Sequence, residues 1–173
     1  TLGHTFLKEV FDFVPRSGWQ LDPFGHSATQ ASLLSRRAGF DSLYFGRIDY
    51  RDLKLRIDSR ECEGVWKTDS DLYGGVFWGL TGSYGGYGPP RGFNFNKNDD
   101  PVDETNAVQR AEDFVKLAVE QGKHTKGNHV MTTMGGDFQY ENAFRNFASL
   151  DALIATLQSH TFAPDILHPY TSI

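Results

Sequence analysis

The stretch Gly18-Trp19-Gln20-Leu21-Asp22-Pro23-Phe24-Gly25-His26-Ser27 decides how the chain folds. A short apolar run, predicted to be a strand, ends at Asp22, and Pro23 restricts Asp22 to an extended conformation. Ser27 is a suitable N-cap for the amphipathic residues that follow, so the pattern predicts a strand, a tight loop and a helix. In such units chemistry is found at the strand end, but a carboxylate that only caps the turn explains Asp22 equally well.

The residues on both sides of this stretch continue the alternation of helices and strands. Helical spacing of apolar residues predicts helices at 2–13, 27–37, 50–60, 103–123 and 150–157. Short apolar runs predict strands at 18–22, 43–46, 63–67 and 129–134, with an edge or boundary segment at 166–170. The Gly- and Tyr-rich run from Gly74 to Gly92 predicts a long surface loop, which is either a binding loop or an insertion without a role.

Composition narrows the class of protein. The chain has 173 residues, which fits one domain, and its 39% hydrophobic and 23% charged residues indicate a globular protein. The net charge of −5 and the absence of a Lys/Arg cluster argue against a nucleic-acid partner. No apolar run approaches the length of a membrane span, and the single cysteine, Cys62, allows no internal disulfide.

Two aspartates occupy equivalent places in the predicted pattern. Asp22 ends one strand, and Gly135-Gly136-Asp137 directly follows the strand predicted at 129–134. A parallel barrel brings the carboxyl ends of its strands to one rim. A glycosidase needs two carboxylates that face each other, one to attack the sugar or activate water and one to protonate the leaving oxygen. On spacing alone the pair is a weak signal for this chemistry.

Several long motifs resemble one known family. Trp19 to Ser27, Gln30 to Leu34, Gly39 to Asp52 and Met131 to Ala143 are similar, in order, to the class II α-mannosidases of glycoside hydrolase family 38. The last motif resembles the lysosomal or vacuolar acid α-mannosidases more than the Golgi enzymes, which usually carry a second Asp in place of Gly136. The resemblance runs from Thr1 to Leu157 and is loose between Cys62 and Val102.

The resemblance implies a role for six residues. Asp22 aligns with the nucleophile and Asp137 with the acid/base of a retaining reaction through a covalent mannosyl-enzyme intermediate. Arg47 aligns with an arginine that lines the active site, and Phe24 with an aromatic beside the mannose ring. Phe95-Asn96 aligns with an aromatic–acid pair that contacts sugar hydroxyls, although Asn96 is an amide where relatives carry an acid.

The resemblance also implies one zinc ion. Asp22 aligns with a residue that both ligates zinc and attacks the sugar. The family's other ligands lie in an HxD and an HHD motif, and neither motif occurs among the six histidines of this chain. His26 stands in a matching motif that gives it a structural part. The chain would therefore supply one zinc ligand, and the remaining ligands would lie outside it.

The expected fold is α/β, with residues 1–173 forming part of an N-terminal parallel (β/α)7-type barrel that is incomplete in this chain. A complete barrel typically takes about 250 residues, so other segments of the same precursor are expected partners. The expected substrates are oligosaccharides with terminal α-linked mannose of the N-glycan type. The expected location in the cell is a lysosome or vacuole, with secretion or the Golgi lumen as the alternative. A non-catalytic sugar-binding remnant remains open, whereas the motifs at 22–27 and 135–143 argue against a relative with the same barrel that acts on another substrate, such as a sugar deacetylase.

Overall fold

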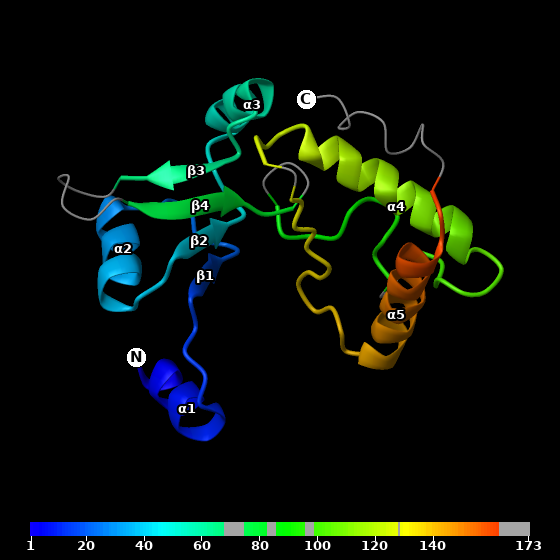
Figure 1. The fold of residues 1–173 in the computed structure, drawn as a ribbon, viewed down its shortest axis with the longest axis horizontal. Coiled ribbons are helices and arrows are strands. Elements are labelled where there is room, and N and C mark those ends of the chain that lie inside the picture. Colours follow the sequence, from blue (N-terminus) through cyan, green and yellow to red (C-terminus); the bar gives the residue numbers. More distant parts are fainter. Residues whose placement is uncertain (68–74, 83–85, 96–98, 128, 163–173) are drawn as a thin grey trace.

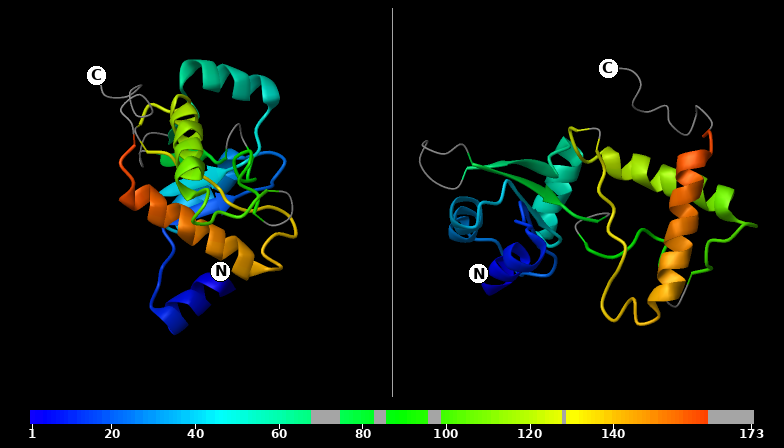
Figure 2. Two further views of the ribbon diagram at one scale, coloured as in Figure 1. Left: turned by 90° about the vertical axis from the view of Figure 1, so that its right-hand side faces the viewer. Right: turned by 60° about the horizontal axis from the view of Figure 1, so that its bottom comes forward.

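The computed structural model describes residues 1–67, 75–82, 86–95, 99–127 and 129–162. Two regions lie side by side in it (Figure 1). A sheet region, residues 17–82, holds the four strands and the helices that cover them. A helical region, residues 86–162, holds two longer helices that lie to one side of the sheet in Figure 1 and in the right-hand view of Figure 2.

The sheet region contains a four-stranded sheet in the order β1-β2-β4-β3. Its strands are β1 (Ser17–Gln20), β2 (Ser42–Phe45), β3 (Glu63–Trp66) and β4 (Val76–Leu80). β1, β2 and β4 are parallel, whereas β3 is antiparallel to β4. The α/β class is therefore confirmed, but the sheet is mixed rather than wholly parallel, and the described strands do not close into a barrel.

The helices of the sheet region pack on one face of the sheet. They are α2 (Ala28–Ser32), which continues as a π-helical turn η1 (Leu33–Arg37), and α3 (Tyr50–Ser59). Ala31 of α2 packs with Leu43 and Val76 in a small buried cluster. From α3, the guanidinium of Arg56 lies 4.9 Å above the centre of the Trp78 ring on the same face.

Local signals set the ends of these helices. The Ser27 hydroxyl accepts a hydrogen bond from the Gln30 backbone N–H at 3.0 Å, so the predicted N-cap is confirmed. Gly39 follows η1 with a φ of +75°, a left-handed conformation that favours glycine. The Asp49 carboxylate accepts from the backbone N–H groups of Arg51 at 2.9 Å and Asp52 at 3.4 Å, and so starts α3.

The predicted loop from Gly74 to Gly92 is wrong in its first part, because residues 76–80 form the inner strand β4. Val76 and Trp78 supply buried side chains to the helix-covered face, as a central strand requires. The strand tolerates Gly79 because the Tyr44 ring packs where a side chain would otherwise lie. A Cβ at position 79 would be only 3.1 Å from that ring. The high glycine content concealed this strand.

The helical region is built from α4 (Ala107–Gly122) and α5 (Ala143–Ser159). α4 begins later than predicted because the Asp103 carboxylate accepts from the Thr105 backbone N–H at 2.9 Å, forming a turn in place of the first helical residues. α5 extends beyond the predicted 150–157 at both ends. Between the helices lies a core formed by Phe93, Phe95, Val102, Ala111 and Leu153.

The strand predicted at 129–134 is wrong, since these residues have no regular secondary structure. Their carbonyl groups accept from side chains instead of a neighbouring strand. Gln121 Nε2 donates to the Met131 carbonyl at 3.0 Å, and the Tyr140 hydroxyl donates to the Met134 carbonyl at 2.5 Å. A strand forms only by pairing, and the described residues place no strand beside this segment.

The first helix, α1 (Leu2–Phe11), buries no residue and lies beside the sheet region, where the ring centre of His4 is 5.5 Å from that of Phe40 (Figure 1). It ends before the predicted Phe13, because Asp12 adopts a left-handed conformation with a φ of 51°. The segment predicted at 166–170 lies outside the described residues. Within the described part of the chain, no helix is both long and apolar enough to span a membrane.

Candidate functional site

Asp22 and Arg47 follow two neighbouring parallel strands. Asp22 lies just beyond β1 and Arg47 just beyond β2, so both emerge at the same edge of the sheet. The Arg47 Nε donates to the Asp22 Oδ1 in a charged hydrogen bond. Both side chains are roughly half exposed, at 43% and 46%. The prediction that these two strand ends meet at one edge is confirmed.

Two aromatic rings surround the Arg47 guanidinium. Its central carbon lies 4.7 Å from the centre of the Phe24 ring and 5.7 Å from that of the Tyr87 ring, which is within the range of cation–π attraction. The hydrogen bond to Asp22 raises the pKa of Arg47 above its usual value, against a lowering by desolvation. The guanidinium is therefore a permanent cation held beside the Asp22 carboxylate.

Tyr87 connects this cation to the second predicted carboxylate. Its hydroxyl donates to the Asp137 Oδ1 at 3.4 Å, while its ring faces Arg47. Asp137 lies in a turn rather than at a strand end, and it is followed by two left-handed residues, Phe138 at φ 57° and Tyr140 at φ 65°. The two aspartates are thus linked through Arg47 and Tyr87, although they come from different regions of the molecule.

A cavity of about 750 Å³ opens beside Asp137. It lies on the sheet face opposite the helices, between β1 and the segment 131–137, and Tyr87 borders it as well. Trp19 of β1 and Met131 contribute apolar surface to its wall. The site thus has a hollow large enough for a small ligand, with carboxylate and phenol groups at its margin.

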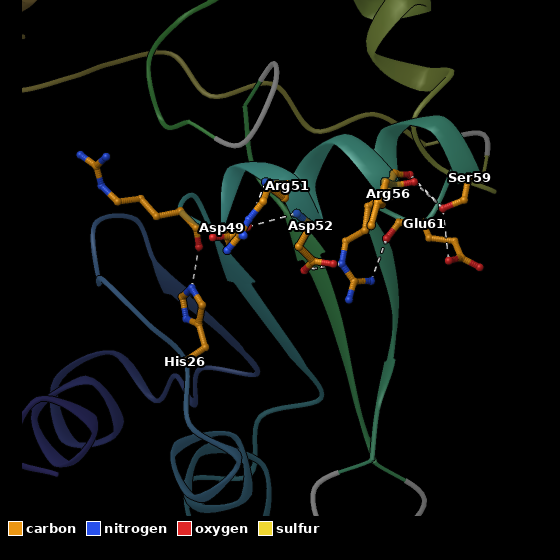
Figure 3. A network of polar contacts seen from close by, with 9 residues as sticks. His26, Asp49, Arg51, Asp52, Arg56, Ser59 and Glu61 are labelled. Atoms are coloured by element: carbon orange, nitrogen blue, oxygen red, sulfur yellow. Dashed lines mark hydrogen bonds and ion pairs between the residues drawn. The ribbon is translucent and has the colours of Figure 1, made fainter.

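His26 joins the loop after β1 to the end of β2. Its Nε2 lies 2.6 Å from the Arg47 carbonyl oxygen, and its ring centre lies 4.1 Å from that of Phe45 (Figure 3). This agrees with a structural part for His26.

The other predicted site residues fall in different places. Phe24 is 86% exposed, in the loop beside Arg47. Phe95 is only 2% exposed and packs edge-on against Phe93 in the core of the helical region. A contact between Phe95 and a sugar is at odds with this burial, because the ring offers a ligand almost no surface. Asn96 lies outside the described residues.

The described residues do not form a complete zinc site. Among them no group of three or more His, Cys, Asp or Glu side chains is close enough together to hold a metal ion. One oxygen of Asp22 is already engaged by Arg47, which leaves a single carboxylate oxygen to offer a cation.

Sequence reasoning did not identify Tyr87. The residue lies in the Gly- and Tyr-rich run that was predicted to be a loop with or without a binding role. Its spacing does not distinguish it from the other tyrosines of that run. Only the folded chain brings its hydroxyl to Asp137 and its ring to Arg47.

The α/β scaffold carries one carboxylate and a cation at an edge of its sheet and links them through Tyr87 to a second carboxylate, and two carboxylates are what glycoside hydrolysis requires. Over residues 1–170 the chain matches the glycosyl hydrolases family 38 N-terminal domain, and it belongs to that family.

Similar proteins include enzymes from plants, an amoeba and an animal. The chain is 45% identical to an alpha-mannosidase of Canavalia ensiformis over 89% of its own length and 16% of that protein. It is 40% identical to a lysosomal alpha-mannosidase of Dictyostelium discoideum (92% and 16%) and 38% identical to that of Homo sapiens (97% and 18%). The chain therefore spans less than a fifth of the length of these relatives.

Proposed function

We propose that this chain is part of the catalytic domain of a retaining exo-α-mannosidase, which removes terminal α-linked mannose from oligosaccharides of the N-glycan type. Family membership supports glycoside hydrolysis, and the printed names of the relatives support mannose as the sugar. In this proposal Asp22 is the nucleophile and Asp137 the acid/base, while Arg47 and Phe24 contact the substrate or its reacting groups.

One observation carries the proposal. A continuous set of contacts runs from Asp22 through Arg47 and Tyr87 to Asp137. It links two carboxylates separated by more than a hundred residues, and Asp137 and Tyr87 of this set also line the cavity. A purely structural ion pair at the sheet edge would account for Asp22 and Arg47, but it would not account for the link through Tyr87 to the second carboxylate.

The geometry suggests how the two carboxylates divide the work. Arg47 engages the Oδ1 of Asp22, which leaves its Oδ2 to attack the anomeric carbon and form a glycosyl ester. Tyr87 engages the Oδ1 of Asp137, which leaves its Oδ2 to protonate the departing glycosidic oxygen. Asp137, now ionised, then takes a proton from water, and the resulting nucleophile releases mannose and regenerates Asp22.

The proposed fold is a partial (β/α)7-type barrel. In a barrel, helices cover the outer face of the sheet, and side chains from all strands fill the interior. Here the helix-free face carries Trp19 and Phe77, which are 51% and 37% exposed. The free edge of β1 is also unpaired among the described strands. Other segments of the same precursor would pair with this edge and fill this face.

The zinc ion implied by the family resemblance is part of the proposal only in a restricted sense. Asp22 could offer it one oxygen, and its remaining ligands would come from outside Thr1–Ile173. No step above depends on it.

We also propose a lysosomal or vacuolar location, on the names of the relatives from Dictyostelium discoideum and Homo sapiens.

The test is to trap the intermediate on the full-length polypeptide that contains this stretch. A fluorinated mannosyl fluoride should leave a mannosyl group on the peptide that contains Asp22, detectable by mass spectrometry, and the first product should keep its anomeric configuration by NMR. In the intact site the two carboxyl groups should lie about 5–5.5 Å apart. Inversion, a separation of about 9 Å, or binding of mannosides without cleavage would contradict the proposal; the last result would identify a sugar-binding remnant.

A further inference from the structure

Arg47 is held by the loop after β1 at two separate points. Its guanidinium meets Asp22, and its backbone carbonyl meets His26, four residues further along the same loop. The carbonyl can only accept a hydrogen bond, so the Nε2 of His26 must carry the proton at 2.6 Å. The direction of this hydrogen bond is thus fixed by chemistry, whatever the charge of the ring.

The His26 ring rests on a rigid support. It packs on Phe45, which is 7% exposed and stacks on Trp78 with ring centres 5.4 Å apart and an interplanar angle of 11°. Arg56 of α3 lies over the Trp78 ring, and its Nε donates to the Asp52 carboxylate at 3.0 Å (Figure 3). The stack connects His26 to α3, so the ring has little freedom to move away from the Arg47 carbonyl.

The backbone is also fixed both after and before Arg47 in the sequence. Asp49 starts α3 two residues later by accepting from the Arg51 and Asp52 N–H groups. On the preceding side, Gly46 approaches the backbone so closely that a Cβ would lie 2.7 Å from the Leu21 carbonyl oxygen. The His26 hydrogen bond is the side-chain contact that fixes the peptide of Arg47 between these two anchors.

We propose that His26 is a positioning residue, whose Nε2–H sets the Arg47 backbone so that the guanidinium meets the Asp22 carboxylate in a productive orientation. The proposal rests on the proposed function for its catalytic consequence, but not for its geometry. Because the guanidinium lies at the end of a long side chain, a rotation of the peptide displaces it further than it displaces the backbone itself. Misplacement by about 1 Å at a reacting group can lower a rate by roughly 100-fold.

Two substitutions separate the hydrogen bond from the packing, both made in the full-length polypeptide. His26→Phe keeps a ring on Phe45 and removes the donor. His26→Gln removes the ring but places its amide N–H near the position of Nε2. The first readout is kcat and KM on an aryl α-mannoside. The second is the rate at which phenylglyoxal modifies Arg47, followed by peptide mass spectrometry, which needs no catalytic activity.

We expect His26→Phe to lower kcat by about 10-fold to 100-fold with little change in KM, and to raise the phenylglyoxal modification rate of Arg47. His26→Gln should restore both values to within about threefold of wild type. If His26→Phe leaves Arg47 modification unchanged, or if His26→Gln is impaired as much as His26→Phe, the positioning role is wrong and His26 acts through packing. An inactive wild type with the expected modification pattern would overturn the proposed function and leave the positioning role standing.

Discussion

The two regions of the molecule differ in where their buried apolar side chains gather. In the helical region, Phe93, Phe95 and Leu153 are each about 2% exposed between the segment before α4 and the two helices. The sheet region buries one face only, around the small cluster of Ala31, Leu43 and Val76, and its other face is open. The region that carries Asp22, Arg47 and His26 thus leaves one face of its sheet for contacts from elsewhere, although α5 also exposes Phe144 and Phe147.

This difference matters for the chemistry, because positioning requires a rigid frame. The proposed nucleophile belongs to the incomplete region, whereas Asp137 belongs to the connection between α4 and α5 in the better-packed region. The contact of Arg47 with the Tyr87 ring bridges the two regions, and within the helical region the Tyr87 hydroxyl then reaches Asp137 at 3.4 Å. The relative placement of the carboxylates therefore depends on how firmly the sheet region is completed.

The largest expected effect comes from isolating the chain. We predict that Thr1–Ile173 expressed alone aggregates or stays molten, binds zinc weakly and has no mannosidase activity, because the open sheet face and the free edge of β1 are costly in water. Hydrogen exchange should show faster exchange in β1 and β2 than in α4. A soluble, cooperatively unfolding monomer with stoichiometric zinc would contradict this prediction.

The second prediction compares the loss of the carboxylate in the sheet region with the loss of the carboxylate in the helical region, both in the full-length polypeptide. Asp22→Ala should lower kcat by on the order of 10⁴-fold or more on every aryl α-mannoside, because it removes the nucleophile. Asp137→Ala should lower it far less on substrates with activated leaving groups, which need little proton donation.

The measurement is kcat/KM across aryl mannosides whose phenols differ in pKa. Asp151→Ala, an exposed carboxylate on α5, is the matched control and should change little. An equal loss on good and poor leaving groups for Asp137→Ala would show that the acid/base role is assigned to the wrong residue.

Part of this site could be predicted from the sequence, because some signals are local. Pro23 and Ser27 fix the loop and the helix start after β1 within a few residues of chain, and the structure follows them. The meeting of Asp22 with Arg47 then follows from parallel pairing. These features need no knowledge of distant segments.

The rest depends on pairing and packing between distant segments. Residues 129–134 have a strand-like sequence, but no described strand lies beside them. β4 contains Gly79, which leaves space for the Tyr44 ring. From the sequence alone, glycine at this position indicated a loop rather than a strand. Phe95 was predicted to contact a sugar and instead lies in the core, since only three-dimensional packing distinguishes these two uses of an aromatic ring.

The third prediction concerns the open face itself. In the full-length polypeptide, Phe95→Ala should lower the free energy of unfolding by about 3–5 kcal/mol, as for any buried aromatic. Trp19 is 51% exposed here, yet we expect Trp19→Ala to cost about 3 kcal/mol as well, because other segments should cover it.

Phe24→Ala provides the comparison, since Phe24 is 86% exposed in the loop and should stay open to the substrate. Its effect on stability should be within about 0.5 kcal/mol. Denaturant unfolding of the polypeptide measures all three. If Trp19→Ala costs no more than Phe24→Ala, the face is not covered, and the partial-barrel proposal loses its main support.

The smallest expected effect compares one exposed carboxylate from each region. The hydrogen bond from the Arg51 side chain, with support from backbone N–H groups, lowers the pKa of Asp49 below its usual value. In the helical region the Thr105 hydroxyl and backbone lower the pKa of Asp103 in the same way. Asn at either position keeps a capping oxygen and removes the charge.

Because each folded-state pKa is lowered, each carboxylate contributes stability that is fully present above its unfolded pKa and is lost as pH falls through the folded value. The gap in melting temperature between wild type and either Asp49→Asn or Asp103→Asn should thus be constant from about pH 7 down to about pH 5 and narrow as the pH falls below the usual pKa of an aspartate. A gap that widens in acid would mean that the sign of the pKa shift is wrong.

Activity should separate the two variants, because Asp49 lies two residues from Arg47 and anchors the turn that carries it, whereas Asp103 precedes α4 and touches no part of the proposed site. We therefore expect Asp49→Asn to lower kcat about twofold to tenfold and Asp103→Asn to leave it unchanged. Equal kcat values for both variants would show that the start of α3 does not influence the position of Arg47.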